Sequence, residues 1–268
     1  MRAADLTVVL TGSSSGIGAE AARQLAARGA TVCLLARRAD ELEAVWAEIV
    51  AGGGTAHTYP VDLTDPDETS EVVARLLSDH PRIDVLVNNA GRSIRRSVAS
   101  SVDRAHDYER TMAVNYLGAV RLTLGLLPRF LEQGHGHVVM SSTMSTQVPV
   151  PLFSAYLGSK AALESFARSL AAENAHRGIT TTVVNFPMVR TRMSGATDIY
   201  AAMPMMSARR AGGWLVKASL DRPTRVSSLS GTAAEIGMAA VPGLVTRVVT
   251  PGIRRMDKRL ARRVRSAD

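Results

Sequence analysis

The chain has 268 residues, of which 46% are hydrophobic and 21% are charged. This composition excludes a chain that is disordered throughout, and no run reaches the roughly 18 apolar residues of a membrane-spanning helix. A single cysteine excludes a disulfide framework and a multi-cysteine metal site, so we expect a cytoplasmic protein. The net charge is +8, and the last 71 residues hold all of this excess, with 13 Arg or Lys against 5 Asp or Glu.

Short apolar runs alternate with helical patterns along the first half of the chain. The runs predict strands over Leu6–Leu10, Thr31–Ala36, Ala56–Val61 and Ile83–Val87. The patterns between them predict helices over Gly16–Arg28, Asp40–Ala51 and Pro66–His80. Repeated strand–helix units of this kind predict an α/β fold, a three-layer doubly wound parallel sheet of the Rossmann type.

Longer elements follow, and the pattern weakens after Pro187. We expect a long helix over Val102–Glu132 with a break, a strand over His137–Ser141, a helix over Ser154–His176 and a strand over Ile179–Asn185. A helix over Trp214–Leu220 and an edge strand over Arg225–Leu229 come next. The best division is one domain over residues 1–230, with a substrate lid at about 188–215, and a basic amphipathic C-terminal extension over 231–268.

A glycine-rich turn follows the first predicted strand and opens the first predicted helix. Its glycines permit a tight turn and close approach of backbone to a pyrophosphate, and the helix presents free N–H groups to that anion. A glycine-rich turn without a ligand is the alternative, but the strand–turn–helix context favours a dinucleotide site. The candidate binding residues are Gly12, Ser14, Ser15, Gly16, Ile17 and Gly18.

Arginine stands where a carboxylate would select NAD(H). The second predicted strand ends in Arg37 and Arg38, and a guanidinium suits a 2′-phosphate by charge and geometry. We therefore expect NADP(H) to be favoured over NAD(H). After the third strand, Asp62 either accepts a hydrogen bond from the adenine amine or caps the next helix, and Leu63 follows it in the same candidate site.

Tyr156 and Lys160 stand four residues apart on a predicted helix and therefore on one face. An adjacent ammonium stabilises a phenolate and lowers the pKa of a tyrosine, which makes it a usable acid–base catalyst. Only three lysines occur among the 32 basic residues, so lysine at this position indicates a need for an amine. No metal site is expected.

These residues resemble the short-chain dehydrogenase/reductase family over roughly residues 5–191. The motifs are TGSSSGIG, Asn88-Asn-Ala-Gly91, Asn115 in VNYLG and Tyr156-Leu-Gly-Ser-Lys160, in the order that the family has them. The resemblance implies an NAD(P)-dependent oxidoreductase that moves hydride between nicotinamide and a carbonyl or alcohol. It assigns catalysis to Asn115, Ser142, Tyr156 and Lys160, and further cofactor contacts to Asn89, Ala90, Gly91, Tyr156, Lys160, Pro187, Val189 and Thr191.

Two positions are ambiguous within that resemblance. Ser142 fits the local motif of the carbonyl-orienting serine, whereas Thr143 fits the family's spacing to the tyrosine; we choose Ser142. Met188 replaces the glycine that usually follows Pro187. A methionine there predicts either a different turn or a flexible apolar side chain that lines the site.

The remainder of the chain bears on substrate and location. The methionine-rich lid segment suits an irregular apolar substrate. The tail and Pro187–Thr191 also resemble reductases of long fatty acyl chains or lipid-linked carbonyls, so we expect a lipid-like ketone or aldehyde. The basic tail is either a peripheral contact with the inner membrane surface, a solvated tail or an oligomer arm.

The resemblance implies a homodimer or homotetramer. No nucleic acid is expected as a partner, because aromatic stacking residues are lacking. The alternative function is non-catalytic, either a nucleotide-binding regulator or a membrane-associated lipid carrier.

Overall fold

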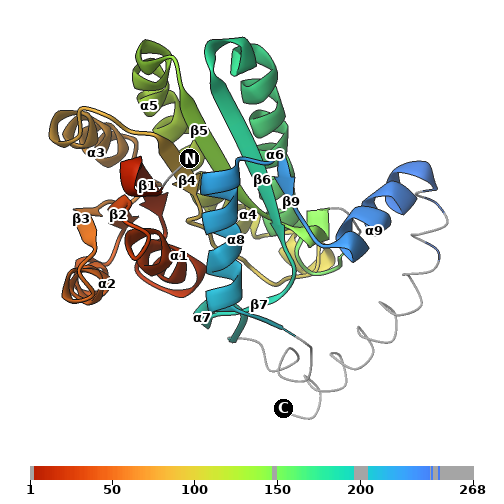
Figure 1. Ribbon diagram of the computed structural model, residues 1–268. Helices are drawn as coiled ribbons and strands as arrows, with labels where there is room; N and C mark the ends of the chain where they lie inside the picture. The colour runs from red at the N-terminus through yellow and green to blue at the C-terminus, as the bar shows by residue number, and fades with distance from the viewer. Residues whose placement is uncertain (1–2, 147–149, 196–204, 242, 244–246, 248–268) are drawn as a thin grey trace.

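A seven-stranded parallel sheet forms the centre of the computed structural model, which describes residues 3–146, 150–195, 205–241, 243 and 247 (Figure 1). The strand order is β3-β2-β1-β4-β5-β6-β9, and every neighbouring pair is parallel. The strands are β1 (Thr7–Thr11), β2 (Thr31–Ala36), β3 (Thr55–Pro60), β4 (Val85–Asn88), β5 (Gly136–Thr143), β6 (Ile179–Phe186) and β9 (Arg225–Val226). A separate two-stranded ladder pairs β7 (Val189–Arg190) with β8 (Met206–Ser207).

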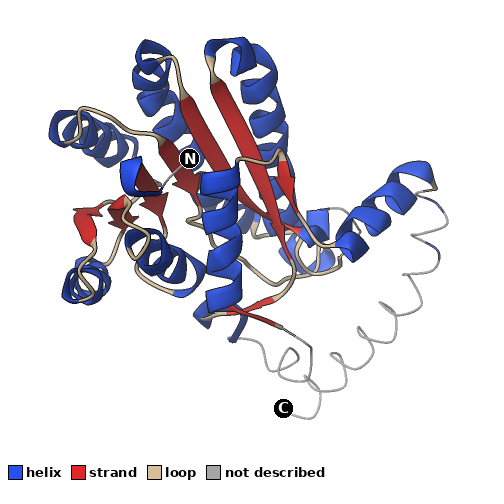
Figure 2. Cartoon of the chain, in the orientation of Figure 1, coloured by secondary structure: helices blue, strands red, loops and turns tan. Residues whose placement is uncertain are grey.

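Helices cover both faces of this sheet (Figure 2). One apolar core joins the sheet to α1 (Gly16–Ala26), α2 (Ala39–Ala51) and α8 (Ala208–Asp221). A second core joins the other face to α3 (Pro66–Asp79), α5 (Ala119–Gln133) and α6 (Ser154–Asn174). The central strands are apolar on both faces because each face is covered by helices, which is the arrangement that the alternating sequence pattern predicts.

The long helix expected over Val102–Glu132 has its break in the middle. It consists of α4 (Ala105–Met112), a π-helical segment over Ala113–Gly118, and α5. A π-helical turn widens the backbone locally and is often found at functional sites. Here the turn carries Asn115, which is 1% exposed.

The C-terminal part departs from the sequence-based expectation. The helix expected over Trp214–Leu220 begins earlier, as α8, because Ser207 accepts the Arg210 N–H at its N-terminus. The edge strand ends at Val226, and Ser228 caps a helix that was not predicted, α9 (Leu229–Ala240), by accepting the Gly231 N–H.

Two of the predicted segments lie outside the residues that the structure describes. The predicted basic run over residues 253–265 lies outside the described residues, as do residues 196–204 of the predicted lid. The short helix α7 (Arg192–Gly195) precedes the latter gap. Among the helices described, none is long and apolar enough to cross a membrane.

Candidate functional site

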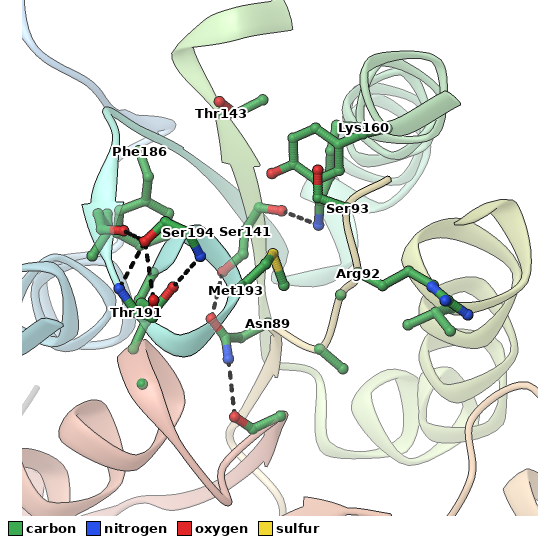
Figure 3. Close-up of a pocket in the computed structure, with 18 of the residues that line it drawn as sticks. Asn89, Arg92, Ser93, Ser141, Thr143, Lys160, Phe186, Thr191, Met193 and Ser194 are labelled. Atoms are coloured by element: carbon green, nitrogen blue, oxygen red, sulfur yellow. Dashed lines mark hydrogen bonds between the residues drawn. The ribbon is translucent and has the colours of Figure 1, made fainter. Parts of the chain in front are cut away.

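A cavity of about 1190 Å³ lies at the carboxyl ends of the parallel strands (Figure 3). This is where doubly wound sheets bind ligands, at the point where the strand order reverses between β1 and β4. The predicted site residues line it, except Gly18 and Asn115. Thr143, the alternative to Ser142, also lines it, and so do Met188, Arg192, Met193 and Ser194 of the predicted lid segment. The lining residues that were not predicted include Arg92, Ser93, Arg95, Val114, Ser141, Leu152, Phe153, Leu157 and Phe186.

The glycine turn between β1 and α1 packs closely against its own backbone and the segment after β4 because Gly12 and Gly18 carry no side chain. Gly12 has φ of 67°, and a Cβ built there would lie 2.9 Å from Ala90 Cα. A Cβ on Gly18 would overlap the Gly12 carbonyl oxygen. Ser15 at the N-terminus of α1 makes no side-chain capping hydrogen bond, so the first N–H groups of the helix remain available to an anion. The turn therefore fits a dinucleotide pyrophosphate.

The segment after β4 is fixed against this turn. Thr11 Oγ1 accepts the N–H groups of Asn89 and Ala90 at 2.9 Å each, and Asn89 Nδ2 donates to the Thr11 carbonyl at 3.0 Å. Ser141 donates to Asn89 Oδ1 at 3.3 Å (Figure 3). These bonds hold three strand ends, β1, β4 and β5, in one wall of the cavity.

The two arginines after β2 differ in how strongly they are held. Arg38 Nη2 donates to Glu41 at 2.6 Å, and this bond is the main cause that lowers the Glu41 pKa to about 2. Arg192 donates to the other oxygen of the same carboxylate at 2.8 Å. Arg37 is 63% exposed and its guanidinium lies 3.6 Å from Asp62, a loose contact that leaves donors available. Asp62 itself accepts from the Thr64 N–H and hydroxyl.

Tyr156 and Lys160 project from α6 into the cavity as the spacing predicts. Lys160 is 3% exposed and its Nζ donates to the Ser141 carbonyl at 2.8 Å. Burial lowers the Lys160 pKa to about 8, against the opposing attraction of Glu164. Burial raises the Tyr156 pKa to about 12, which is opposite to the lowering that the pattern predicts. The reason is that loss of hydration around Tyr156 dominates in this structure.

Ser142 and Thr143 differ in what their hydroxyls contact. The Ser142 hydroxyl, buried on the α6 side of β5, donates to Glu164 Oε1. The same oxygen accepts from Thr146 Oγ1 and from Asn185 Nδ2 at 2.8 Å each. Thr143 Oγ1 instead accepts the Ser145 N–H at 3.2 Å, and its hydroxyl proton is not used in any hydrogen bond between described residues. The geometry therefore favours Thr143, the alternative to the predicted Ser142, as the hydroxyl that can donate to a ligand.

Asn115 is held rather than free. Its Oδ1 accepts the Arg92 N–H at 2.8 Å, and its Nδ2 donates to the Arg92 carbonyl and to Ser159 Oγ at 2.9 Å each. A Cβ on Gly91 would lie 3.2 Å from Asn115 Oδ1 and 3.5 Å from Lys160 Nζ, so both side chains converge behind Gly91. Asn115 thus fixes the loop after β4 next to the lysine.

Sequence reasoning missed Glu164 and the arginines of the loop after β4. Glu164 follows Lys160 by one helical turn, so its place on the same helix face could have been predicted. Its three hydrogen-bond donors could not, because they come from segments distant in the sequence. Arg92 and Arg95 carried no motif of their own, and only the folded loop brings them to the cavity.

Comparison with known proteins agrees with this geometry. Residues 6–199 match the short chain dehydrogenase family. A Mycobacterium bovis oxidoreductase is 45% identical over 90% of this chain and 72% of its own. Fatty acyl-CoA reductases from Acinetobacter baylyi and Mycobacterium tuberculosis are each 42% identical, over 88% and 85% of this chain and 80% and 79% of theirs.

Solved structures give the same result for the fold. A short-chain dehydrogenase from Streptomyces avermitilis has a TM-score of 0.77 at 27% identity, over 94% of this chain and 98% of that one. A Beutenbergia cavernae protein, described as a gluconate 5-dehydrogenase with bound NADP, also has a TM-score of 0.77 at 30% identity, over 84% and 95% of the two chains. The predicted fold class, family resemblance and enzyme class are confirmed.

Proposed function

Since the chain belongs to the short-chain dehydrogenase family, a family of NAD(P)-dependent oxidoreductases, we propose that it uses NADP(H) and reduces the carbonyl group of a lipid-like substrate. The observation that carries this proposal is the convergence of Tyr156, Lys160 and the end of β5 on one cavity that also contains the glycine turn. A reduced nicotinamide, when bound, supplies the hydride. The chain's own residues bind, orient and provide the proton.

Tyr156 is the proposed proton donor to the substrate oxygen. With a pKa of about 12 its hydroxyl is protonated at neutral pH, which is the state that reduction requires. Lys160, charged below its pKa of about 8, stabilises the phenolate that forms when the proton leaves. Asn115 positions the loop behind Lys160. We propose that the proton which Tyr156 donates is replaced from solvent along this side of the site.

Thr143 is the proposed donor that orients the substrate carbonyl. The Ser142 hydroxyl already donates its proton in a hydrogen bond to Glu164 Oε1, and donating to a substrate instead would leave a buried carboxylate short of one hydrogen bond. Thr143 lines the cavity and ends the same strand, so it is placed to donate without that loss. A hydrogen bond to the carbonyl oxygen stabilises the charge that develops there during hydride attack.

Arg37 and Arg38 support the preference for NADP(H). Both line the cavity at the end of β2, where the ribose of the adenosine half would lie. Arg38 is held by Glu41, and Arg37 is exposed beside Asp62. Arg37 is therefore the better placed of the two to meet a 2′-phosphate.

Apolar lining supports a lipid-like substrate. Leu152, Phe153, Leu157, Met188 and Met193 contribute to the cavity next to the polar end of β5. Such a wall favours binding of an apolar substrate chain, and the flexible methionine side chains can pack against a chain of irregular shape. The two relatives described as fatty acyl-CoA reductases give the same direction.

The assembly and location of the protein are further parts of the proposal. We propose a homodimer or homotetramer, found in the cytoplasm, in which residues 1–230 form the catalytic domain. The basic extension over 231–268 would contact an anionic membrane surface. Co-sedimentation with anionic vesicles at low salt, lost at high salt, is the expected result, and equal sedimentation with neutral vesicles would contradict it.

Replacing Tyr156 by Phe tests the proposed chemistry directly. We expect NADPH consumption with long-chain aldehydes or acyl thioesters in the wild-type protein, and loss of turnover in Tyr156→Phe with NADPH binding retained. Tyr108→Phe is a matched control, because that tyrosine bonds Ser154 outside the cavity lining. Turnover near the wild-type level in Tyr156→Phe would overturn the assignment.

A further inference from the structure

Two arginines in the cavity wall have no counter-charge in the described structure. Arg92 and Arg95 both line the cavity, in the loop that follows β4. Neither guanidinium forms an ion pair or a hydrogen bond with another described residue. The neighbouring cations are different, since Arg96 and Arg104 both bind Asp107, at 2.9 and 3.1 Å.

The backbone that carries these two side chains is fixed. Asn115 clamps both the N–H and the carbonyl of Arg92. Next to Arg95, the Arg96 N–H donates to the Leu152 carbonyl at 2.7 Å, and Arg96 forms an isolated parallel bridge with Phe153. The loop is thus attached to the apolar wall that Leu152 and Phe153 contribute.

Arg92 lies on the side of the cavity opposite to the end that contains the glycine turn. Thr191 and Ser194 lie at that end, where a Cβ on Gly16 would lie 3.4 Å from the Thr191 side chain. Figure 3 shows Arg92 beside Ser93 on the opposite side, with its guanidinium directed away from Thr191 and Ser194. Arg37 and Arg38 serve the cofactor end, so the Arg92 side is left for the substrate.

A cavity with an apolar wall and two guanidinium groups without a described protein partner, one on exposed Arg92 and one on half-buried Arg95, fits an amphipathic anion. Guanidinium groups bind phosphate through two parallel N–H donors, and such charge-assisted bonds are stronger than neutral ones. A fatty acyl thioester of coenzyme A has both parts, an apolar chain and a carrier with phosphates. A free fatty aldehyde has only the first.

We propose that Arg92 and Arg95 bind the phosphate groups of coenzyme A in an acyl thioester substrate. This inference rests on the proposed reductase function and names its substrate class. The thioester carbonyl then lies near Tyr156 and Thr143, and the acyl chain lies along the wall that includes Leu152 and Phe153. NADPH would supply the hydride to the carbonyl carbon and the C–S bond would break, so that one acyl thioester, one NADPH and one proton give the aldehyde, the free thiol of coenzyme A and NADP⁺. Other phosphopantetheine thioesters share part of this chemistry and serve as a comparison in the test.

The kinetic test compares one acyl chain on three carriers. Palmitoyl-CoA, palmitoyl-phosphopantetheine and the phosphate-free palmitoyl N-acetylcysteamine thioester are assayed with wild-type protein and with the Arg92→Gln/Arg95→Gln variant. Since each arginine lost removes charge-assisted bonds, we expect KM for palmitoyl-CoA to rise about tenfold or more. KM for the N-acetylcysteamine thioester should change less than about twofold. A smaller rise for palmitoyl-phosphopantetheine than for palmitoyl-CoA assigns part of the binding to the nucleotide phosphates.

A matched control and a binding measurement complete the test. Arg28→Gln removes an exposed arginine whose guanidinium donates to the Gln24 carbonyl, outside the cavity lining, and should leave every KM unchanged. Calorimetry of free coenzyme A with NADPH-saturated protein should show binding to the wild type that is weakened in the double variant. An equal rise of KM for all three carriers, or equal coenzyme A binding by both proteins, would overturn the inference. Absence of turnover with all three thioesters but turnover with palmitaldehyde would refute the thioester inference alone. Absence of turnover with palmitaldehyde as well would refute the reductase proposal, while the calorimetry still decides the role of the arginines.

Discussion

Replacing Lys160 by Met should remove activity and yet stabilise the protein. Burial lowers the Lys160 pKa from 10.5 to about 8, so keeping the ammonium in the folded state at pH 7 costs about 3 kcal/mol. Methionine fills similar volume without charge, but it leaves the Ser141 carbonyl without its donor, a loss of about 1 kcal/mol. We therefore expect the free energy of unfolding to rise by about 2 kcal/mol at pH 7.

Denaturant unfolding from pH 7 to pH 10 measures this effect. Between pH 8 and 10.5 the unfolded chain binds the Lys160 proton and the folded protein does not, so wild-type stability gains with rising pH from this group. The difference in the free energy of unfolding between Lys160→Met and the wild type should therefore become smaller between about pH 8 and 10. Lys217→Met, at a 60% exposed lysine, should change stability by less than about 0.5 kcal/mol at any pH. A Lys160→Met protein that is less stable than wild type at pH 7, or whose difference from it does not vary with pH, would refute the reasoning.

Further predictions concern cofactor and catalysis. Arg37→Gln should raise KM for NADPH by about tenfold and leave KM for NADH nearly unchanged; equal effects on both would contradict the assignment. Gly18→Ala should weaken binding of either cofactor, measured by nicotinamide fluorescence, because its Cβ overlaps the Gly12 carbonyl. Reductive kcat/KM should be constant below about pH 8 and fall above it as Lys160 loses its charge, and a profile flat to pH 10 would exclude this role. Thr143→Val should lower kcat about 100-fold, whereas an equal loss in Ser142→Ala alone would restore Ser142 as the donor.

Local sequence signals predicted most of the sheet and much of the cavity. Glycines at 12, 16 and 18 act within one strand–turn–helix unit, and Tyr156 and Lys160 lie one helical turn apart, so their geometry follows from short-range spacing. The break in the long helix was also visible, although its π-helical form was not.

The features that were missed depend on contacts between distant segments. Whether Ser142 or Thr143 faces a ligand is decided by Glu164, 22 residues after Ser142, and by the register of β5 against α6. Likewise, Arg92 and Arg95 become cavity residues only when Asn115 and Leu152 fix their loop. The Tyr156 pKa is raised by burial of the side chain, and the extent of burial cannot be predicted from helical spacing.

Deuterium transfer tests the central claim most directly. The protein is incubated with NADPH that is deuterated at nicotinamide C4 on the transferred face, each face being tried in turn, and with a long-chain aldehyde or acyl thioester. We expect mass spectrometry to find deuterium on the carbon that carried the carbonyl oxygen, for one of the two labelled faces and not with Tyr156→Phe. NADPH oxidation without deuterium in the product from either face would contradict it.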